Sequence, residues 1–361
     1  MNPLLQLKDY GQSIWLDYIR RDFVTGGEIT KLILEDGLTG MTSNPAIFER
    51  AIGGGNEYAP AIRSLKDKGL NAMGLYEALA IEDIRSAADL LAPVFKASEG
   101  RDGYVSLEVS PFLANDTAAT VAEAQRLWRE VSRPNLMIKV PATTAGLPAI
   151  EQLIAFDMNV NVTLLFARGM YAAVAERYIA GLERRAAESL DVDRIASVAS
   201  FFVSRIDAAV DPLLPQELRG KTAIANAKLA YESYERIFSG TRWENLAEKG
   251  AQPQRLLWAS TSTKNPAYRD VLYVEELIGS NTVNTLPPAT LAAFREHGLP
   301  RASLTEDLAG ARATLAAVEK HLKLEDITDQ LLVDGVKLFE DAFDKLLAAV
   351  EVAQKAAQKT A

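Results

Sequence analysis

The chain has 361 residues, 48% of them hydrophobic and 24% charged, which is typical of a globular enzyme and long enough for one large barrel or two ordinary domains. Its 39 basic and 48 acidic residues give a net charge of −9, which argues against broad binding to nucleic acids or anionic membranes. No apolar run approaches the roughly 20 residues of a membrane-spanning helix, and the N-terminus lacks a secretory pattern, so we expect a cytoplasmic protein.

Eight apolar segments of strand length alternate with segments of helical periodicity. The strands are predicted at 13–17, 40–48 with a turn at Asn44-Pro45, 103–109, the run through Lys139 that stops at Pro141, 158–166, 195–203, 255–260 and 281–286. Strands that alternate with helices form parallel sheets. Because no linker or break in composition interrupts the alternation, the pattern predicts one (β/α)8 barrel.

The predicted helices lie between these strands and after the last one. They comprise 19–36 (broken at Gly26 and Gly27), 116–132 capped by Asp116, 147–155, a long helix to about 189, 222–239, 305–322 and 328–355. We expect one domain over 1–361, with a helical insertion near 51–100 and C-terminal helices over 300–361. The glycines at 53–55 indicate a flexible link rather than a phosphate-binding loop, because no Gly-Lys-Ser/Thr follows them.

A lysine stands inside the apolar run NLMIKVPATT, with Ile138 and Val140 on either side of Lys139. A buried ammonium group is costly, and burial favours the neutral amine, which attacks carbonyl carbon and forms Schiff bases. We therefore hypothesise that Lys139 forms a Schiff base with a sugar ketone. The alternative is a lysine at a strand end whose head reaches into water.

Polar residues recur near the C-terminal ends of the predicted strands. They are Asp17, Asn44, Glu108, Lys139, Asn161, Thr163, Ser200 and Arg205. In a (β/α)8 barrel this end carries the active site. Each residue alone has an ordinary explanation, such as a helix cap or a turn, but their recurrence on successive strands favours a catalytic site.

The chain contains no cysteine and two histidines, His297 and His321, both in polar helical sequence. Disulfides, thiolate metal sites and cysteine nucleophiles are thus excluded, and a serine–histidine triad or a histidine metal site is disfavoured. Any chemistry must use Lys, Asp, Glu, Tyr or hydroxyl groups.

These residue types suit cleavage of a ketose. The iminium formed on Lys139 withdraws electrons and permits cleavage between C3 and C4, for which Asp17 would accept the C4 hydroxyl proton. Glu108 would shuttle protons, with Thr163 holding the water. The predicted substrate-binding groups are the amides of Asn44 and Asn161, Arg205 as a phosphate clamp, and Lys264, Ser260 and Ser262 beside it.

The segments SIWLD, GMTSNPAIFE, VSLEVSP, LMIKVPAT, NVNVTLLF, SFFVSRID and WASTSTKNP resemble the transaldolase family, specifically its longer bacterial form. The matches span roughly residues 10–290, one per predicted strand. The resemblance implies a class I aldolase barrel without metal or cofactor. It also implies transfer of dihydroxyacetone from sedoheptulose 7-phosphate to glyceraldehyde 3-phosphate, giving erythrose 4-phosphate and fructose 6-phosphate.

The resemblance also implies roles for single residues. By motif, Lys139 is the Schiff-base lysine, Asp17 the base, and Glu108 with Thr163 the pair that handles water. Asn44, Asn161, Ser200 and Phe202 line the substrate, and Arg205 binds phosphate. One departure is the stretch Ser262, Thr263, Lys264, where many transaldolases carry serine, an aromatic residue and arginine. Lysine is a point charge and holds a phosphate less directionally than the planar guanidinium group of arginine.

Two alternatives stay open at this stage. A fructose 6-phosphate aldolase would release free dihydroxyacetone, but such enzymes are shorter and typically carry glutamine and tyrosine where this chain has Glu108 and Phe202. A non-catalytic barrel that binds sugar phosphates would be expected to lack Lys139, Asp17 or Glu108, and all three are present. A barrel that uses a metal or pyridoxal cofactor fits the histidine positions poorly. Monomer and homodimer both remain open.

Overall fold

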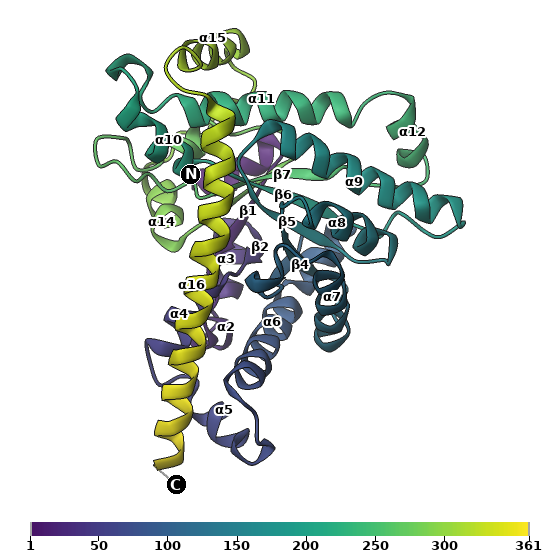
Figure 1. Cartoon of the computed structure of the whole chain (residues 1–361), viewed down its shortest axis with the longest axis vertical. Coiled ribbons are helices and arrows are strands. Elements are labelled where there is room, and N and C mark those ends of the chain that lie inside the picture. Colours follow the sequence, from purple (N-terminus) through teal and green to yellow (C-terminus); the bar gives the residue numbers. More distant parts are fainter. Residues whose placement is uncertain (1, 360–361) are drawn as a thin grey trace.

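The computed structural model describes residues 2–359, and within them eight parallel strands form a closed barrel in chain order (Figure 1). The strands are β1 (Gln12–Asp17), β2 (Leu38–Thr42), β3 (Tyr104–Glu108), β4 (Leu136–Pro141), β5 (Val160–Leu165), β6 (Ser197–Phe202), β7 (Arg255–Ala259) and β8 (Thr282–Leu286). Pairing of β1 with β8 closes the ring. The predicted (β/α)8 barrel is confirmed.

Helices surround the barrel. They are α1 (Pro3–Gln6), α2 (Arg21–Thr25), α3 (Glu28–Asp36), α4 (Pro45–Gly53), α5 (Ala59–Ser64), α6 (Ala72–Ala97), α7 (Thr117–Val131), α8 (Gly146–Ala155), α9 (Arg168–Ala187), α10 (Ser204–Val210), α11 (Thr222–Ile237), α12 (Thr241–Ala247), α13 (Leu272–Glu275), α14 (Pro288–His297), α15 (Leu308–Val318) and α16 (Leu324–Lys359). The predicted cap of α7 is confirmed, because Asp116 accepts a hydrogen bond from the Ala119 amide at 2.9 Å. Over residues 2–359, every helix is too short or too polar to cross a membrane.

The predicted strand over 40–48 is wrong in its second half. Strand β2 ends at Thr42, and α4 begins at Pro45. Asn44 is the N-cap of α4, and its side chain accepts a hydrogen bond from the Ile47 amide at 3.0 Å. Asparagine followed by proline favours a helix start, because the side chain satisfies a free amide and proline fixes φ at a helical value.

The strand register places three of the predicted site residues side by side. Glu108 pairs with Lys139 across β3 and β4, and Lys139 pairs with Asn161 across β4 and β5. Both β4 and β5 are buried along their whole length. The barrel itself therefore fixes the spacing of these side chains.

The long helix α16 crosses one end of the barrel. It contacts α4, α10 and the 3-10 helix at Pro111–Leu113, which follow β2, β6 and β3 respectively. These segments leave the C-terminal ends of their strands, so α16 lies over the C-terminal mouth. In Figure 1 it runs in yellow along the length of the molecule.

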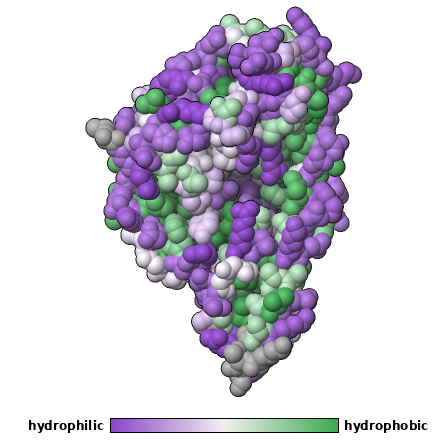
Figure 2. All heavy atoms as spheres, turned by 90° about the vertical axis from the view of Figure 1, so that its left-hand side faces the viewer, coloured by the Kyte–Doolittle hydropathy of each residue, from purple (hydrophilic) through white to green (hydrophobic). Residues whose placement is uncertain are grey.

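Helix α16 continues beyond the barrel and packs against α4 and α5. The three helices border an open groove whose lining includes Ile52, Ile62 and Val352. Figure 2 shows a largely hydrophilic face with hydrophobic atoms at the narrow lower end of the molecule. This end is a projection built by the segment after β2 together with the C-terminal helix.

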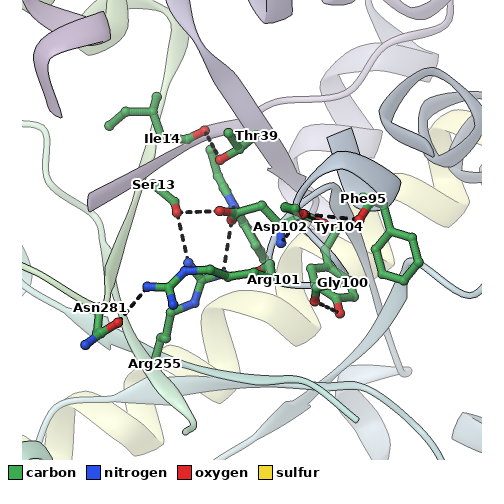
Figure 3. Close-up of polar contacts among 12 residues, drawn as sticks. Ser13, Ile14, Thr39, Phe95, Gly100, Arg101, Asp102, Tyr104, Arg255 and Asn281 are labelled. Carbon is green, nitrogen blue, oxygen red and sulfur yellow. Dashed lines mark hydrogen bonds and ion pairs between the residues drawn. The ribbon is translucent and has the colours of Figure 1, made fainter. Parts of the chain in front are cut away.

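The opposite end of the barrel is closed by a buried polar network (Figure 3). Arg255, the first residue of β7, forms an ion pair with Asp102 at 3.0 Å and donates to the Ser13 hydroxyl at 2.9 Å. Asp102 also accepts hydrogen bonds from Ser13 at 2.7 Å and from the Trp15 ring nitrogen at 3.2 Å. We call these four side chains the floor network.

Candidate active site

The sequence-predicted site residues all lie at the C-terminal side of the barrel. Asp17 is the last residue of β1 and Glu108 the last residue of β3. Lys139 is in β4, Asn161 and Thr163 are in β5, and Ser200 and Phe202 are in β6. The others lie in the segments that follow strands: Asn44 caps α4, Arg205 is in α10, and Ser260, Ser262 and Lys264 follow β7. Strand order and the shared parallel direction bring them to the same mouth.

Lys139 is buried, with 4% of its surface exposed. Its Nζ donates a hydrogen bond to the Ser43 carbonyl oxygen at 3.2 Å and lies 3.5 Å from Glu108 Oε2. The alternative of a lysine head that reaches into water is therefore wrong. The amine stays inside the mouth, beside a carboxyl group.

Burial raises the pKa of Glu108 to about 7, although the nearby Lys139 charge opposes the shift, and the Asp17 charge adds to it. Within residues 2–359 neither Glu108 oxygen accepts a hydrogen bond, and both are shielded from solvent. A carboxyl group with a pKa near 7 can both accept and return a proton at neutral pH. Glu108 thus has the properties of a proton shuttle.

Thr163 is fully buried, and its hydroxyl also lacks a hydrogen-bond partner among the described residues. Unpaired buried hydroxyls are rare in folded proteins and call for an explanation. The next residue, Leu164, has φ of 59° where β5 departs from regular pairing with β6. Such a left-handed conformation costs a leucine roughly 1–2 kcal/mol, and strain of this kind gathers at functional sites.

Asp17 faces the same site from β1. Burial raises the pKa of its carboxyl group, while the charges of Lys139 and Arg205 and a hydrogen bond from Thr42 oppose the shift. The Thr42 hydroxyl lies 2.7 Å from Asp17 Oδ1 and 2.8 Å from the Thr285 hydroxyl. A chain of hydroxyl groups from β2 and β8 therefore holds the carboxylate in place.

Asn161 is held at both ends of its amide. Its Nδ2 donates to the Ser106 hydroxyl at 3.0 Å, and its Oδ1 accepts from the Ser200 hydroxyl at 2.7 Å. Asn44, by contrast, uses its side-chain oxygen to cap α4, which leaves its NH₂ group for a ligand. The Asn44 NH₂ group is thus left for a substrate, whereas both the Nδ2 and the Oδ1 of Asn161 already have a partner in the barrel.

Positive charge gathers beyond β6 and β7. The guanidinium carbon of Arg205 lies 5.1 Å from the centre of the Phe202 ring, and burial lowers the pKa of Arg205. Partial burial and the charge of Arg205 lower the pKa of Lys264, whose amine donates to the Ser262 hydroxyl at 2.9 Å. The Ser260 hydroxyl instead pairs with Ser204 at 3.0 Å. Two neighbouring cations stabilise a bound anion.

Several contacts in the mouth involve residues that the sequence did not single out. Thr42, Ser106 and Thr285 are polar residues of strands, and only Ser106 stands between two apolar neighbours, which was the available signal. Phe339 of α16 had no such signal; the centre of its ring lies 5.7 Å from Lys139 Nζ. In the part of the chain that the structure describes, no three His, Cys, Asp or Glu side chains are grouped to hold a metal ion.

Comparison with known proteins agrees with this geometry. The sequence model of the transaldolase/fructose-6-phosphate aldolase family matches residues 14–350. The chain belongs to this family. Among family members, it is 47% identical to transaldolase 2 of Nostoc punctiforme, over 97% of both chains. It is 49% identical to a transaldolase of Parafrankia sp., over 96% of this chain and 97% of the relative. It is 48% identical to a transaldolase of Thiobacillus denitrificans, over 97% of this chain and 100% of the relative.

Proposed function

We propose that the chain is a transaldolase that transfers a dihydroxyacetone unit reversibly from sedoheptulose 7-phosphate to glyceraldehyde 3-phosphate, with erythrose 4-phosphate and fructose 6-phosphate as products. Membership of the family and the names of its similar relatives support this activity. The observation that carries the proposal is the buried Lys139 amine, 3.5 Å from a carboxyl group in the barrel mouth.

The first step joins the ketose to the protein. The amine nitrogen of Lys139 attacks the C2 carbonyl, and the resulting carbinolamine loses water to form an iminium. Glu108 supplies the proton that leaves with this water and takes it back during hydrolysis, which its pKa of about 7 permits. We assign the unpaired Thr163 hydroxyl to this water, because the two residues leave unfilled hydrogen-bonding capacity in the same mouth.

Cleavage follows from the iminium. Asp17 accepts the proton of the C4 hydroxyl, the C3–C4 bond breaks, and its electron pair moves towards the iminium nitrogen to give an enamine. The aldehyde half leaves, and C3 of the enamine then attacks the acceptor aldehyde while Asp17 returns the proton. The hydroxyl chain through Thr42 keeps the Asp17 carboxylate directed for this role.

The remaining residues bind and orient the substrate. Asn44 and Asn161 would hold hydroxyl groups of the dihydroxyacetone unit, with Ser200 fixing the Asn161 amide. Arg205 and Lys264 would bind the phosphate with Ser262, and Ser260 would act through Ser204. Because the Lys264 amine is a single charged centre that already bonds Ser262, whereas the Arg205 guanidinium is planar and can bind two oxygens, we expect Arg205 to supply the directional contacts.

The alternative is release of free dihydroxyacetone, the reaction of a fructose 6-phosphate aldolase. The similar relatives are named transaldolases, and their names therefore favour transfer over the aldolase reaction. Phe202 is buried and offers no proton to the enamine. Transfer is thus expected over release.

An acceptor test separates the two activities. The protein is incubated with fructose 6-phosphate, with and without erythrose 4-phosphate, and both glyceraldehyde 3-phosphate and dihydroxyacetone are measured. A transaldolase forms glyceraldehyde 3-phosphate at a steady rate only when the acceptor is present. Rapid formation of dihydroxyacetone without acceptor would overturn the proposal.

We further propose that the whole chain acts as one catalytic domain, including the helices over 51–100 and 300–361. A monomer or homodimer and a cytoplasmic location stay predictions from the sequence. Size-exclusion chromatography with light scattering would decide the first.

A further inference from the structure

The C-terminal helix α16 presents one face to the candidate active site. Gly335, Phe339 and Phe343 follow each other at intervals of four residues, so they lie along one side of the helix. Phe339 and Phe343 are 7% and 4% exposed. We call these three residues the mouth face of α16.

Each residue of the mouth face meets a different part of the barrel mouth. The Phe339 ring centre lies 5.7 Å from Lys139 Nζ. The Phe343 ring packs edge-on against Tyr76 at 5.4 Å and Phe112 at 5.9 Å. At Gly335 an added Cβ would lie 3.0 Å from Leu164 Cδ2 and 3.8 Å from Arg205 Nη1. Glycine therefore lets the helix approach Leu164 and Arg205 closely.

We propose that Phe339 is a specificity-determining residue that keeps proton donors, including water, away from C3 of the enamine on Lys139. This inference rests on the proposed transaldolase function. The ring covers the lysine from the side of α16, has no exchangeable proton, and is itself almost fully buried. It thereby favours transfer to an aldehyde over release of free dihydroxyacetone.

Release requires one event that transfer does not, the addition of a proton to C3 of the enamine. This proton restores the iminium, and water then adds to C2, as it also does when the ketose product of transfer is hydrolysed from Lys139. The C2–N bond breaks, dihydroxyacetone leaves, and the Lys139 amine returns to its starting state. The added proton must come from an acid or from water near C3, and the apolar ring of Phe339 donates no proton and blocks the approach of water from the side of α16.

The test measures the ratio of release to transfer. Release is the rate of dihydroxyacetone formation from fructose 6-phosphate alone, and transfer is the rate of glyceraldehyde 3-phosphate formation with erythrose 4-phosphate present. In Phe339→Ala the ratio should rise at least about tenfold, because water can then reach C3 and donate a proton while the catalytic groups remain. Phe339→Leu retains a smaller apolar cover and should raise the ratio at least about threefold; it decides the question if the alanine variant does not fold.

The matched control is Leu346→Ala. Leu346 is fully buried on the same side of α16, seven residues beyond Phe339, so its loss loosens the docked helix without uncovering the lysine. The ratio should stay within about twofold of the native value even if both rates fall. An equal rise in Leu346→Ala, or no rise in the Phe339 variants, would overturn the inference.

Failure of the inference differs from failure of the proposed function. If the native protein neither transfers nor is trapped on Lys139 by borohydride with fructose 6-phosphate, the proposed function is wrong. If the native protein does both and the Phe339 variants keep its ratio, the function stands, and only the role of Phe339 is rejected.

Discussion

At the N-terminal end of the barrel Asp102 and Arg255 are buried together, and at the C-terminal end Glu108 and Lys139 are buried together. The first pair is 3.0 Å apart, and both partners form hydrogen bonds with Ser13 (Figure 3). Asp102 also accepts one from Trp15. The second pair is 3.5 Å apart, and the Glu108 oxygens accept no hydrogen bond within residues 2–359.

The difference separates stability from reactivity. A buried ion pair whose two partners also form hydrogen bonds with neighbouring groups holds a single arrangement, and it is costly to break. A buried carboxyl group with free lone pairs and a pKa of about 7 is instead ready to exchange a proton. A buried acid–base pair thus stabilises the N-terminal end of the barrel, where it is Asp102 with Arg255. At the C-terminal end the pair Glu108 and Lys139 is suited to proton transfer.

The largest expected effect is that of Lys139→Ala on activity. Turnover should fall by more than about a thousandfold, because a covalent catalyst is lost. The free energy of unfolding should stay within about 1 kcal/mol of native, since the Glu108 carboxyl can stay protonated. Steady-state assays and urea denaturation would check both, and near-native turnover would remove lysine from the mechanism.

The floor network should respond in the opposite way. Asp102→Ala leaves the Arg255 charge buried without its partner and should lower the free energy of unfolding by about 3–5 kcal/mol. Turnover per folded molecule should stay close to native.

Asp89→Ala is the matched control, because it breaks the exposed ion pair with Arg133, in which the Asp89 side chain is 57% exposed. This substitution should cost less than about 1 kcal/mol. Comparable losses in both variants would mean that burial of the floor network adds nothing to stability.

Asp17→Asn should separate the two halves of the reaction. Borohydride trapping of fructose 6-phosphate should be spared, because Schiff-base formation does not use this carboxylate. Cleavage should slow by about a hundredfold or more, the typical contribution of a general base. Equal loss of trapping and cleavage would assign Asp17 a different role.

The smallest effect is a change in how stability depends on pH. Glu108 has its pKa raised from 4.5 to about 7 in the folded chain, so the folded state binds more protons than the unfolded state between these values. The free energy of unfolding therefore falls as pH rises through this window, by about 2–3 kcal/mol from this group. Glu108→Gln should remove that part of the fall.

Some pH dependence should remain in Glu108→Gln, because burial also raises the pKa of Asp17, and that of Asp207 to about 7. Glu235→Gln, at an exposed position on α11, is the control and should leave the profile unchanged. Urea denaturation at pH 5, 6, 7 and 8 would measure the pH dependence of the free energy of unfolding for the native protein and both variants. The same dependence in the native protein and in Glu108→Gln would show that Glu108 has the same pKa in the folded and unfolded states.

Much of the barrel could be predicted because its signals are local. Each strand is a short apolar run, and parallel strands bring Glu108, Lys139 and Asn161 together through register alone. The start of α4 at Pro45 was missed because Asn-Pro fits both a turn and a helix cap. Short helices such as α10 and α12 were also missed, since their few residues carry little periodicity.

The contacts between distant segments could not be predicted. Phe339 lies 200 residues beyond Lys139 along the chain. The hydrophobic periodicity of α16 does not indicate which end of the barrel this helix crosses. The pairing of Asp102 with Arg255 joins positions 153 residues apart. Such contacts depend on how the finished barrel closes rather than on any nearby pattern.

The most direct test of the account is borohydride reduction of the protein in the presence of fructose 6-phosphate, followed by peptide mapping. The account predicts a stable adduct on the peptide that contains Lys139, and none on that peptide in Lys139→Ala. An adduct on another lysine such as Lys264, or no adduct on a protein that still performs transfer, would contradict it.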